Sequence, residues 1–340
     1  MKRISSITIS GYRSFAREAA CEVPLGSLSV LIGPNGSGKS NIVSIFKMLR
    51  HYAEVDKLLK YLIQQDCAAQ FHLGPKRTPN AHVGFTISED GVRDERLLLG
   101  LAFTAPAGIA VTASESPKEA PFLRNIRVFQ FNDTSLASNV RLPSYVDNSE
   151  MLLSDGANLA AVLNRIKTTA EWSKYYERIV TYVTSVFPGF GDFRFTEDPT
   201  RRSVMLNWCD CDDPDYIYGP HQLSDGTLRF MALATLLLAP PELLPSVIVI
   251  DEPELGLHPA AIGALASMMK IASAAVQVVV ATQSPRLLDE FDPSQVLVVE
   301  RDKVSRSSIC RRLDVDSLSE WLADYSLSDL WEKNLLGGNP

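Results

Sequence analysis

Four nearly continuous aliphatic runs stand out along the chain, and each of them leads directly into glycine or a polar residue. The runs cover residues 28–32, 247–250, 275–281 and 296–299. Runs of this kind are typical of strands that are buried on both faces, as in a parallel sheet covered by helices. We therefore predict a parallel or mixed central sheet that presents functional residues at the carboxyl ends of its strands.

A second pattern, typical of antiparallel strands, occupies the N-terminal part of the chain. Residues 82–87 and 97–103 are rich in β-branched and apolar residues and flank the turn Glu89-Asp90-Gly91, which predicts a meander. Residues 4–9 predict an edge strand or one arm of a hairpin. The weakly patterned stretch 105–120 is predicted to be a loop with a short strand piece inside it.

Apolar residues recur at helical spacing in three further segments. They predict a helix from about Lys39 to Leu62 with a break near His51, a helix over 171–187 that ends at Pro188-Gly189, and a helix over 227–238. The middle helix belongs to a small helical lobe.

The first aliphatic run leads into a glycine-rich loop that fits G-x-x-x-x-G-K-[S/T] at every specified position. Between a strand and a helix, such a loop cradles phosphate, because its backbone N–H groups and the helix N-terminus point at the anion. We predict that Lys39 contacts the β- and γ-phosphates and that Ser40 contacts Mg²⁺. The predicted nucleotide-binding residues here are Gly33, Pro34, Asn35, Gly36, Ser37, Gly38, Lys39, Ser40 and the adjoining Asn41.

The second aliphatic run ends in two carboxylates, Asp251 and Glu252. A strand that delivers acids to the sheet edge beside a phosphate loop predicts phosphoryl-transfer chemistry, which needs mainly positioning and charge from the protein. We expect Asp251 to hold the hydration shell of Mg²⁺ and Glu252 to polarise the attacking water. A helix N-cap is the alternative role for such an acid pair.

The composition restricts the kinds of binding partner that the protein can have but identifies none of them. The net charge of −7 gives no overall basic field for nucleic acid, so DNA binding would need a local patch. Five scattered cysteines form no disulfide framework, and the first residues lack the apolar region of a signal peptide. With no apolar run long enough to cross a bilayer, we expect a cytoplasmic protein without a membrane partner.

Residues 223–230, Leu-Ser-Asp-Gly-Thr-Leu-Arg-Phe, resemble the signature motif of ABC-type ATPases, with Asp225 where that family usually has glycine. A serine and a glycine that open a helix form an anion site. The resemblance implies that Ser224 and Gly226 contact the γ-phosphate held by the glycine loop of a second copy. ATP would then join two chains head to tail.

Residues 251–259, Asp-Glu-Pro-Glu-Leu-Gly-Leu-His-Pro, resemble the D-loop region of the RecF/SMC/OLD-like branch of that family. The third aliphatic run leads to Gln283, where family members usually carry a histidine that touches the γ-phosphate. Glutamine still donates a hydrogen bond but cannot carry a proton as histidine does. The resemblance therefore implies ATP binding with slow hydrolysis.

Two further contacts to the nucleotide have candidates. In the family a glutamine reaches Mg²⁺ and the attacking water, and Gln130 stands in a suitable order for that role, with Gln64, Gln65 and Gln70 as rivals. Arg13, with Ser14 beside it, is placed to reach the nucleotide from the side.

Taken together, the motifs predict an α/β P-loop NTPase with an ABC-ATPase head, an antiparallel β subdomain and a small helical lobe. We expect an N-terminal ATPase lobe at 1–130, an insert lobe at 131–222, a C-terminal ATPase lobe at 223–300 and a tail at 301–340. At about 1.5 Å per residue, the insert is too short for the long coiled coil of SMC proteins. The tail, which closes with Leu330-Trp331 and Gly337-Gly338-Asn339-Pro340, is too short for the nuclease domain of OLD-type proteins.

The resemblance implies an ATPase that uses ATP and Mg²⁺, forms a homodimer through ATP and serves as a conformational switch. In the first reading it controls a separately encoded effector protein in DNA-related or phage-defence processes. In the alternative it is a RecF-like repair clamp whose ATP-bound dimer grips duplex DNA.

Smaller features have simpler explanations. Cys209-Asp210-Cys211-Asp212-Asp213 predicts an exposed acidic turn rather than a metal site, because no second Cys/His pair stands at zinc spacing. The basic pairs Lys76-Arg77 and Arg201-Arg202 predict solvated turns, with a DNA contact as the alternative. The C-terminal apolar residues are predicted to dock a tail on the core, with a partner surface as the alternative: Trp321, Tyr325, Leu330 and Trp331.

Overall fold

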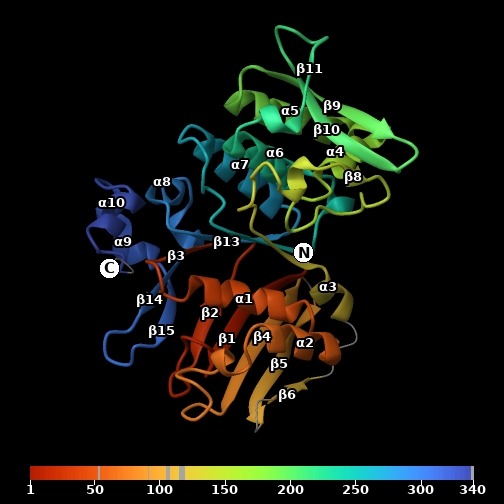
Figure 1. Ribbon diagram of the computed structural model, residues 1–340. Coiled ribbons are helices and arrows are strands. Elements are labelled where there is room, and N and C mark those ends of the chain that lie inside the picture. The colour runs from red at the N-terminus through yellow and green to blue at the C-terminus, as the bar shows by residue number, and fades with distance from the viewer. Residues whose placement is uncertain (53, 91, 105–107, 115–118, 338–340) are drawn as a thin grey trace. The chain divides into compact units, whose positions relative to one another are not determined.

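The computed structural model describes residues 1–52, 54–90, 92–104, 108–114 and 119–337 (Figure 1). Gly91 of the predicted turn, parts of the loop at 105–120, and residues 338–340 of the closing segment lie outside the described residues. The chain divides into two compact units. The first contains Met1–Val128, Ser246–Asp251 and Val276–Pro340, and the second contains Phe129–Pro245 and Glu252–Ala275.

The first unit contains the predicted central sheet, whose strand order is β15-β14-β3-β13-β12-β7. The pairs β12–β13, β13–β3 and β3–β14 are parallel, and β15 pairs antiparallel with β14. Every residue of β3 and β13 is buried, as the aliphatic runs predict for strands covered on both faces. The strands are β3 (Leu28–Ile32), β7 (Ile126–Phe129), β12 (Val247–Asp251), β13 (Gln277–Thr282), β14 (Val296–Arg301) and β15 (Ser308–Arg312).

A five-stranded antiparallel sheet of order β2-β1-β4-β5-β6 forms the predicted β subdomain of the same unit. Strand β1 pairs with β2 as a hairpin arm but also with β4, so the prediction of an edge strand is wrong. Residues Ile4, Ile7 and Ile9 are fully buried, which favours an internal place in the sheet. The strands are β1 (Arg3–Ser10), β2 (Cys21–Pro24), β4 (Asn80–Glu89), β5 (Val92–Thr104) and β6 (Gly108–Ala113).

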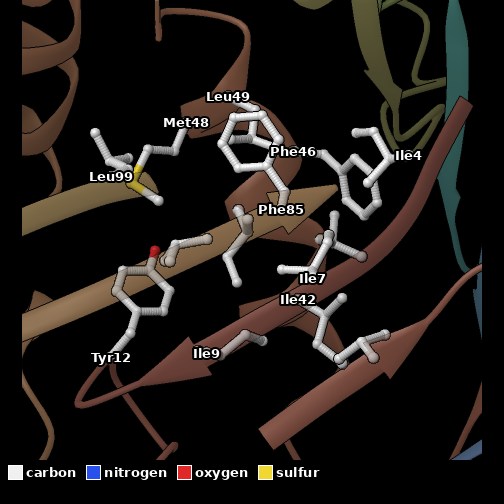
Figure 2. Packing of buried hydrophobic residues seen from close by; sticks show 14 of the residues in the cluster. Ile4, Ile7, Ile9, Tyr12, Ile42, Phe46, Met48, Leu49, Phe85 and Leu99 are labelled. Carbon is white, nitrogen blue, oxygen red and sulfur yellow. The ribbon is translucent and has the colours of Figure 1, made fainter. Parts of the chain in front are cut away.

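Helix α1 (Lys39–Leu49) joins the two sheets of the first unit in one core. Figure 2 shows Ile42, Phe46 and Leu49 of this helix facing Ile7 of β1 and Phe85 of β4. Residues of β12, β13 and β14 belong to the same buried cluster. Because α1 begins at the glycine loop, this packing fixes the direction in which its N-terminus points.

The predicted break near His51 is present, and helix α2 (Val55–Gln64) follows it. The other helices of the first unit are α3 (Ala120–Arg124), α8 (Pro285–Leu288), α9 (Val315–Leu322) and α10 (Leu327–Glu332). Short 3₁₀ turns of this unit lie at Ala68–Gln70 and Pro293–Gln295.

The second unit contains four helices and a small antiparallel sheet (Figure 1), with α4 and α5 packed against the sheet and α6 and α7 packed against other helices. Its helices are α4 (Leu159–Thr168), α5 (Ser173–Val186), α6 (Asp225–Leu238) and α7 (Ala261–Ser273), and its strands are β8 (Ser144–Tyr145), β9 (Phe190–Asp198), β10 (Ser203–Asp210) and β11 (Ile217–Tyr218). Its 3₁₀ turns lie at Asn139–Arg141, Ala170–Trp172, Pro220–Gln222 and Pro241–Leu243. Helix α5 matches the helix predicted over 171–187 and ends before Pro188.

The C-terminal segment docks only in part. Leu330 and Trp331 are buried, whereas Trp321 and Tyr325 are 47% and 37% exposed. The Ser328 hydroxyl and backbone N–H both donate to the Asp289 carboxylate, at 2.6 and 2.8 Å, which fastens α10 next to α8. The docking prediction therefore holds for α10 and is wrong for the two aromatic residues before it.

Among the described residues, none of the helices combines the length and the apolar character that a bilayer crossing requires.

Candidate functional site

The glycine-rich loop lies between β3 and α1, and its backbone takes conformations that favour glycine. Gly33 and Gly38 have φ of 153° and 119°, in the left-handed region. The Lys39 side chain is buried, and its ammonium group donates to the carbonyl oxygens of Gly33 and Pro34. The lysine charge is thus held directly over the loop.

The loop fits a phosphate group on the evidence of its own polar atoms. The Ser37 hydroxyl is buried and, in the part of the chain that the structure describes, has no hydrogen-bond partner. A buried hydroxyl in this state costs free energy unless a ligand atom satisfies it. The start of α1 adds the partial positive charge of an eleven-residue helix. Ser40 is exposed at that start, so a metal ion has access to its hydroxyl.

Strand register brings other predicted residues to the same edge of the central sheet. Ile32 of β3 lies opposite Thr282 of β13, and Ala281 of β13 lies opposite Asp251 at the end of β12. The glycine loop, Gln283 and Asp251 therefore leave three adjacent parallel strands at nearly the same level. This is the edge where open α/β sheets place their ligands.

Glu252 follows Asp251 with φ of 50°, a left-handed conformation that is uncommon for a residue with a side chain. Such backbone strain is often found at functional sites. This conformation ends the strand at Asp251, so the backbone at Glu252 no longer follows the direction of β12.

Arg13 also has a left-handed backbone, with φ of 49°. Its backbone N–H and its Nε donate to the Gln70 carbonyl and Oε1, at 3.0 and 3.3 Å. The Gln70 side chain is fully buried and also donates to the backbone oxygens of Gln65 and Asp66. Gln70 thus supports Arg13, and its side-chain amide is engaged by these contacts.

Arg13 lines an open cavity of about 450 Å³ together with Ser14, Asn41, Gln65, Ala69 and Arg301. The Asn41 amide donates to the Ser14 hydroxyl at 2.7 Å, so the cavity adjoins the helix that follows the glycine loop. Two guanidinium groups at its wall suit a polar, anionic ligand.

In the second unit, Ser224 is the N-cap of α6. Its hydroxyl accepts from the Thr227 backbone N–H at 3.1 Å. Gly226 packs against the backbone that follows Glu252, since a Cβ atom at this position would lie 2.5 Å from the Gly256 oxygen. A side chain at residue 226 would therefore push the signature segment away from the predicted D-loop.

Asp225, the departure from the family pattern, pairs with an arginine that no sequence motif marks. Arg141 is 5% exposed, and its Nη2 donates to the Asp225 carboxylate at 2.7 Å. The same guanidinium donates to the backbone oxygens of Thr134, Pro220 and Leu223. Arg141 therefore holds the start of the signature segment from inside the lobe.

Arg229 connects three loops in the second unit. Its guanidinium donates to the carbonyl oxygens of Phe131, Asn132 and Leu255. Phe131 and Asn132 directly follow Gln130, and Leu255 belongs to the predicted D-loop. Burial lowers the pKa of Arg229, but an arginine remains charged. The sequence contains one signal: Arg229 stands in a largely apolar helix, where an arginine needs buried partners.

Two of the smaller predicted features lie on the surface of the second unit. One ligand atom each of Asp210, Cys211 and Asp212 lies within 4.8 Å of the others, and the last two residues are exposed, as expected for an acidic turn. Arg201 and Arg202 pair with Asp198 and Asp147, at 3.6 and 2.6 Å.

Comparison with known proteins finds related sequences and folds. A family model described as "AAA domain, putative AbiEii toxin, Type IV TA system" matches residues 28–100 and 216–289. The chromosome partition protein Smc of Desulfitobacterium hafniense is 50% identical over 44 residues, which are 13% of this chain. The match spans only 4% of the length of that curated relative.

Solved structures resemble nearly the whole chain. The SMC head domain from Thermotoga maritima matches with a TM-score of 0.53 and 17% identity, covering 92% of this chain and 100% of that one. An Smc head domain with an extended coiled coil, bound to the C-terminal domain of ScpA and derived from Pyrococcus furiosus, matches with a TM-score of 0.65 and 13% identity. That match covers 95% of this chain and 99% of the other. The predicted fold class is therefore confirmed.

Proposed function

We propose that this chain is an ABC-type ATPase head of the SMC-like branch and that it binds Mg²⁺–ATP in the loop from Gly33 to Ser40. The observation that carries the proposal is the loop itself, with a buried lysine at its base and an unpartnered buried hydroxyl at Ser37 among the described residues. Asp251 and Gln283 leave adjacent strands at the same sheet edge, which supports a complete nucleotide site there.

Each residue then has a separate task in hydrolysis. Lys39 neutralises the β- and γ-phosphates, Ser40 and Asp251 hold the metal, and Glu252 accepts the proton of the attacking water. When bound, Mg²⁺ offsets charge on the phosphates during transfer. Gln130 and Gln283 orient water and phosphate through hydrogen bonds. Since Gln283 cannot carry a proton as histidine does, we expect slow turnover.

We further propose that two copies close head to tail on two ATP molecules. The N-terminus of α6 offers Ser224 and Gly226 to the γ-phosphate bound by the partner copy. A fourteen-residue helix provides the partial positive charge for that contact. The Arg141–Asp225 ion pair offsets the negative charge that Asp225 brings to this surface.

The output would be a conformational signal in the cytoplasm to a separately encoded effector. The matching family description names a toxin of a type IV TA system, which favours a defence-type role. All five cysteines are free, which fits a reducing compartment. A RecF-like clamp on duplex DNA is the alternative, although the ion pairs of Arg201 and Arg202 leave less free positive charge for it.

The ATPase proposal is tested with Lys39→Ala, Glu252→Gln and the exposed control Lys57→Ala. We expect Lys39→Ala to weaken ATP binding by about 100-fold. Glu252→Gln should keep binding and lower turnover by about 100-fold or more. Lys57→Ala should match the wild type. Calorimetric titration with Mg²⁺–ATP and phosphate release give the two readouts. The proposal fails if both site variants bind and hydrolyse ATP as the wild type does.

A gel shift separates the two outputs. Wild type, Glu252→Gln and Lys39→Ala are each incubated with linear duplex DNA, with and without a non-hydrolysable ATP analogue. The effector reading expects no ATP-dependent shift at 150 mM salt, a concentration that screens weak nonspecific contacts. A shift that requires the analogue and is lost in Lys39→Ala would favour the clamp instead.

A further inference from the structure

The hairpin formed by β14, the last predicted core strand, and β15 lies directly against the glycine loop. We propose that Ser308, the first residue of β15, is a positioning residue for phosphate binding. Its hydroxyl holds the peptide between Ser37 and Gly38 in the orientation that a phosphate requires. The inference rests on the proposed ATP site and adds to it a residue that lies 268 positions after Ser40 in the sequence.

Ser308 is 1% exposed and contacts both the glycine loop and the Arg13 segment. Its hydroxyl donates to the Ser37 carbonyl oxygen and lies 2.7 Å from the Ser14 hydroxyl. Its backbone N–H donates to the Ser14 carbonyl at 2.8 Å. Ser14 in turn accepts from the Asn41 amide at 2.7 Å, so one buried polar network joins β15, the Arg13 segment and the start of α1.

The glycines of the loop show how close this hairpin comes. A Cβ atom on Gly38 would lie 2.4 Å from the Ser308 hydroxyl, and one on Gly33 would lie 2.0 Å from the Val299 backbone oxygen of β14. Real Cβ atoms do not approach other atoms so closely. Both positions thus require glycine because of the hairpin, in addition to their left-handed backbone.

The geometry of the peptide bond links the Ser308–Ser37 hydrogen bond to the direction in which the Gly38 N–H points. In a trans peptide the C=O and N–H bonds point in opposite directions. The Ser37 carbonyl points at Ser308, so the Gly38 N–H points away from the hairpin, toward the other side of the loop. A phosphate cradle needs its backbone N–H groups on one common side. Without the Ser308 hydroxyl, the carbonyl is buried without this donor and the peptide loses its anchor.

The test compares Ser308→Ala and Ser308→Cys with Ser307→Ala as the matched control. Cysteine keeps nearly the volume of serine but donates only weakly, so it separates the hydrogen bond from packing. Ser307 is also buried, at 2% exposed, and precedes the same strand, but its hydroxyl accepts from the Ala16 backbone N–H and not from the loop. Its replacement reports the general cost of losing a buried hydroxyl in this hairpin.

We expect both Ser308 variants to bind Mg²⁺–ATP about tenfold more weakly, with KM raised by the same factor and kcat within about twofold of the wild type. Ser307→Ala should lower the thermal midpoint by about as much as the Ser308 variants do, but it should leave the Kd for Mg²⁺–ATP unchanged. The inference is overturned if the folded Ser308→Cys binds ATP as the wild type does, or if Ser307→Ala weakens binding equally. A wild type that binds no ATP, or binds it independently of Lys39, would instead overturn the proposed function.

Discussion

Two buried arginines of the second unit show how single residues hold the predicted catalytic loops. Arg141 fixes the start of the signature segment, and Arg229 joins the loops after Gln130 and Glu252 to α6. Each guanidinium donates several hydrogen bonds to backbone oxygens, a geometry that only arginine provides with its planar fork. Neither residue needs to touch ATP to influence how the loops respond to it.

At this scale we predict that Arg229→Met destabilises the protein strongly. The substitution leaves the carbonyls of Phe131, Asn132 and Leu255 without their common donor, and we expect a loss of about 3 kcal/mol in the free energy of unfolding. The exposed Arg178→Met in α5 is the control and should change stability by less than about 0.5 kcal/mol. Urea denaturation measures both, and equal midpoints for the two variants would contradict the prediction.

The next scale is that of the elements, where the C-terminal helices behave differently from each other. Helix α10 buries Leu327, Leu330 and Trp331, whereas α9 buries none of its residues. The Ser326 hydroxyl accepts from the Asp329 N–H at 3.1 Å, and this N-cap with the Ser328–Asp289 bonds fixes where α10 begins. Thus α10 is an integral part of the first unit, and α9 is a connection on its surface.

This difference predicts unequal costs for two truncations of large apolar side chains. Leu330→Ala should lower the free energy of unfolding by about 3 kcal/mol, because Leu330 is fully buried. Trp321→Ala should lower it by less than about 0.5 kcal/mol, because nearly half of that side chain is exposed. Thermal denaturation of both variants measures the two losses of stability. A larger loss for Trp321→Ala would mean that α9, not α10, anchors the segment.

For the whole molecule, the proposed head-to-tail dimer predicts complementation between two inactive variants. Lys39→Ala weakens phosphate binding by the glycine loop of its own chain. Ser224→Arg blocks the contact of the signature segment with the nucleotide bound to the other chain. Neither variant alone forms a dimer with an intact site, whereas a mixed dimer has one intact composite site out of two. We therefore expect the equal mixture to be clearly more active than either variant alone, up to about half of the wild-type turnover.

The same mixture supplies its own controls. Each variant alone should be inactive, and size-exclusion chromatography with light scattering should show no ATP-dependent dimer for Ser224→Arg. If the mixture is no more active than its components, the composite site does not exist. If Ser224→Arg alone turns over ATP at the wild-type rate, each chain hydrolyses ATP without the signature of a partner.

Local sequence patterns were sufficient to predict a feature wherever the residues that determine it are neighbours in the sequence. The aliphatic runs, the loop from Gly33 to Ser40 and the helix cap at Ser224 each depend on contacts within one element or turn. Strands buried on both faces and glycines with left-handed backbone leave a direct signal in composition and spacing. For this reason the fold class and the position of the glycine loop followed from the sequence alone.

Only the tertiary structure decided which distant residues support those patterns. Arg141 carries no motif, and Ser308 lies in a segment whose pattern suggests nothing more than a tail. Their roles come from strand pairing and from burial, which bring residues 82 and 271 positions apart within hydrogen-bond distance. A polar side chain gains a specific partner only when the fold excludes water around it, and the sequence of one segment does not record which other segment will do so.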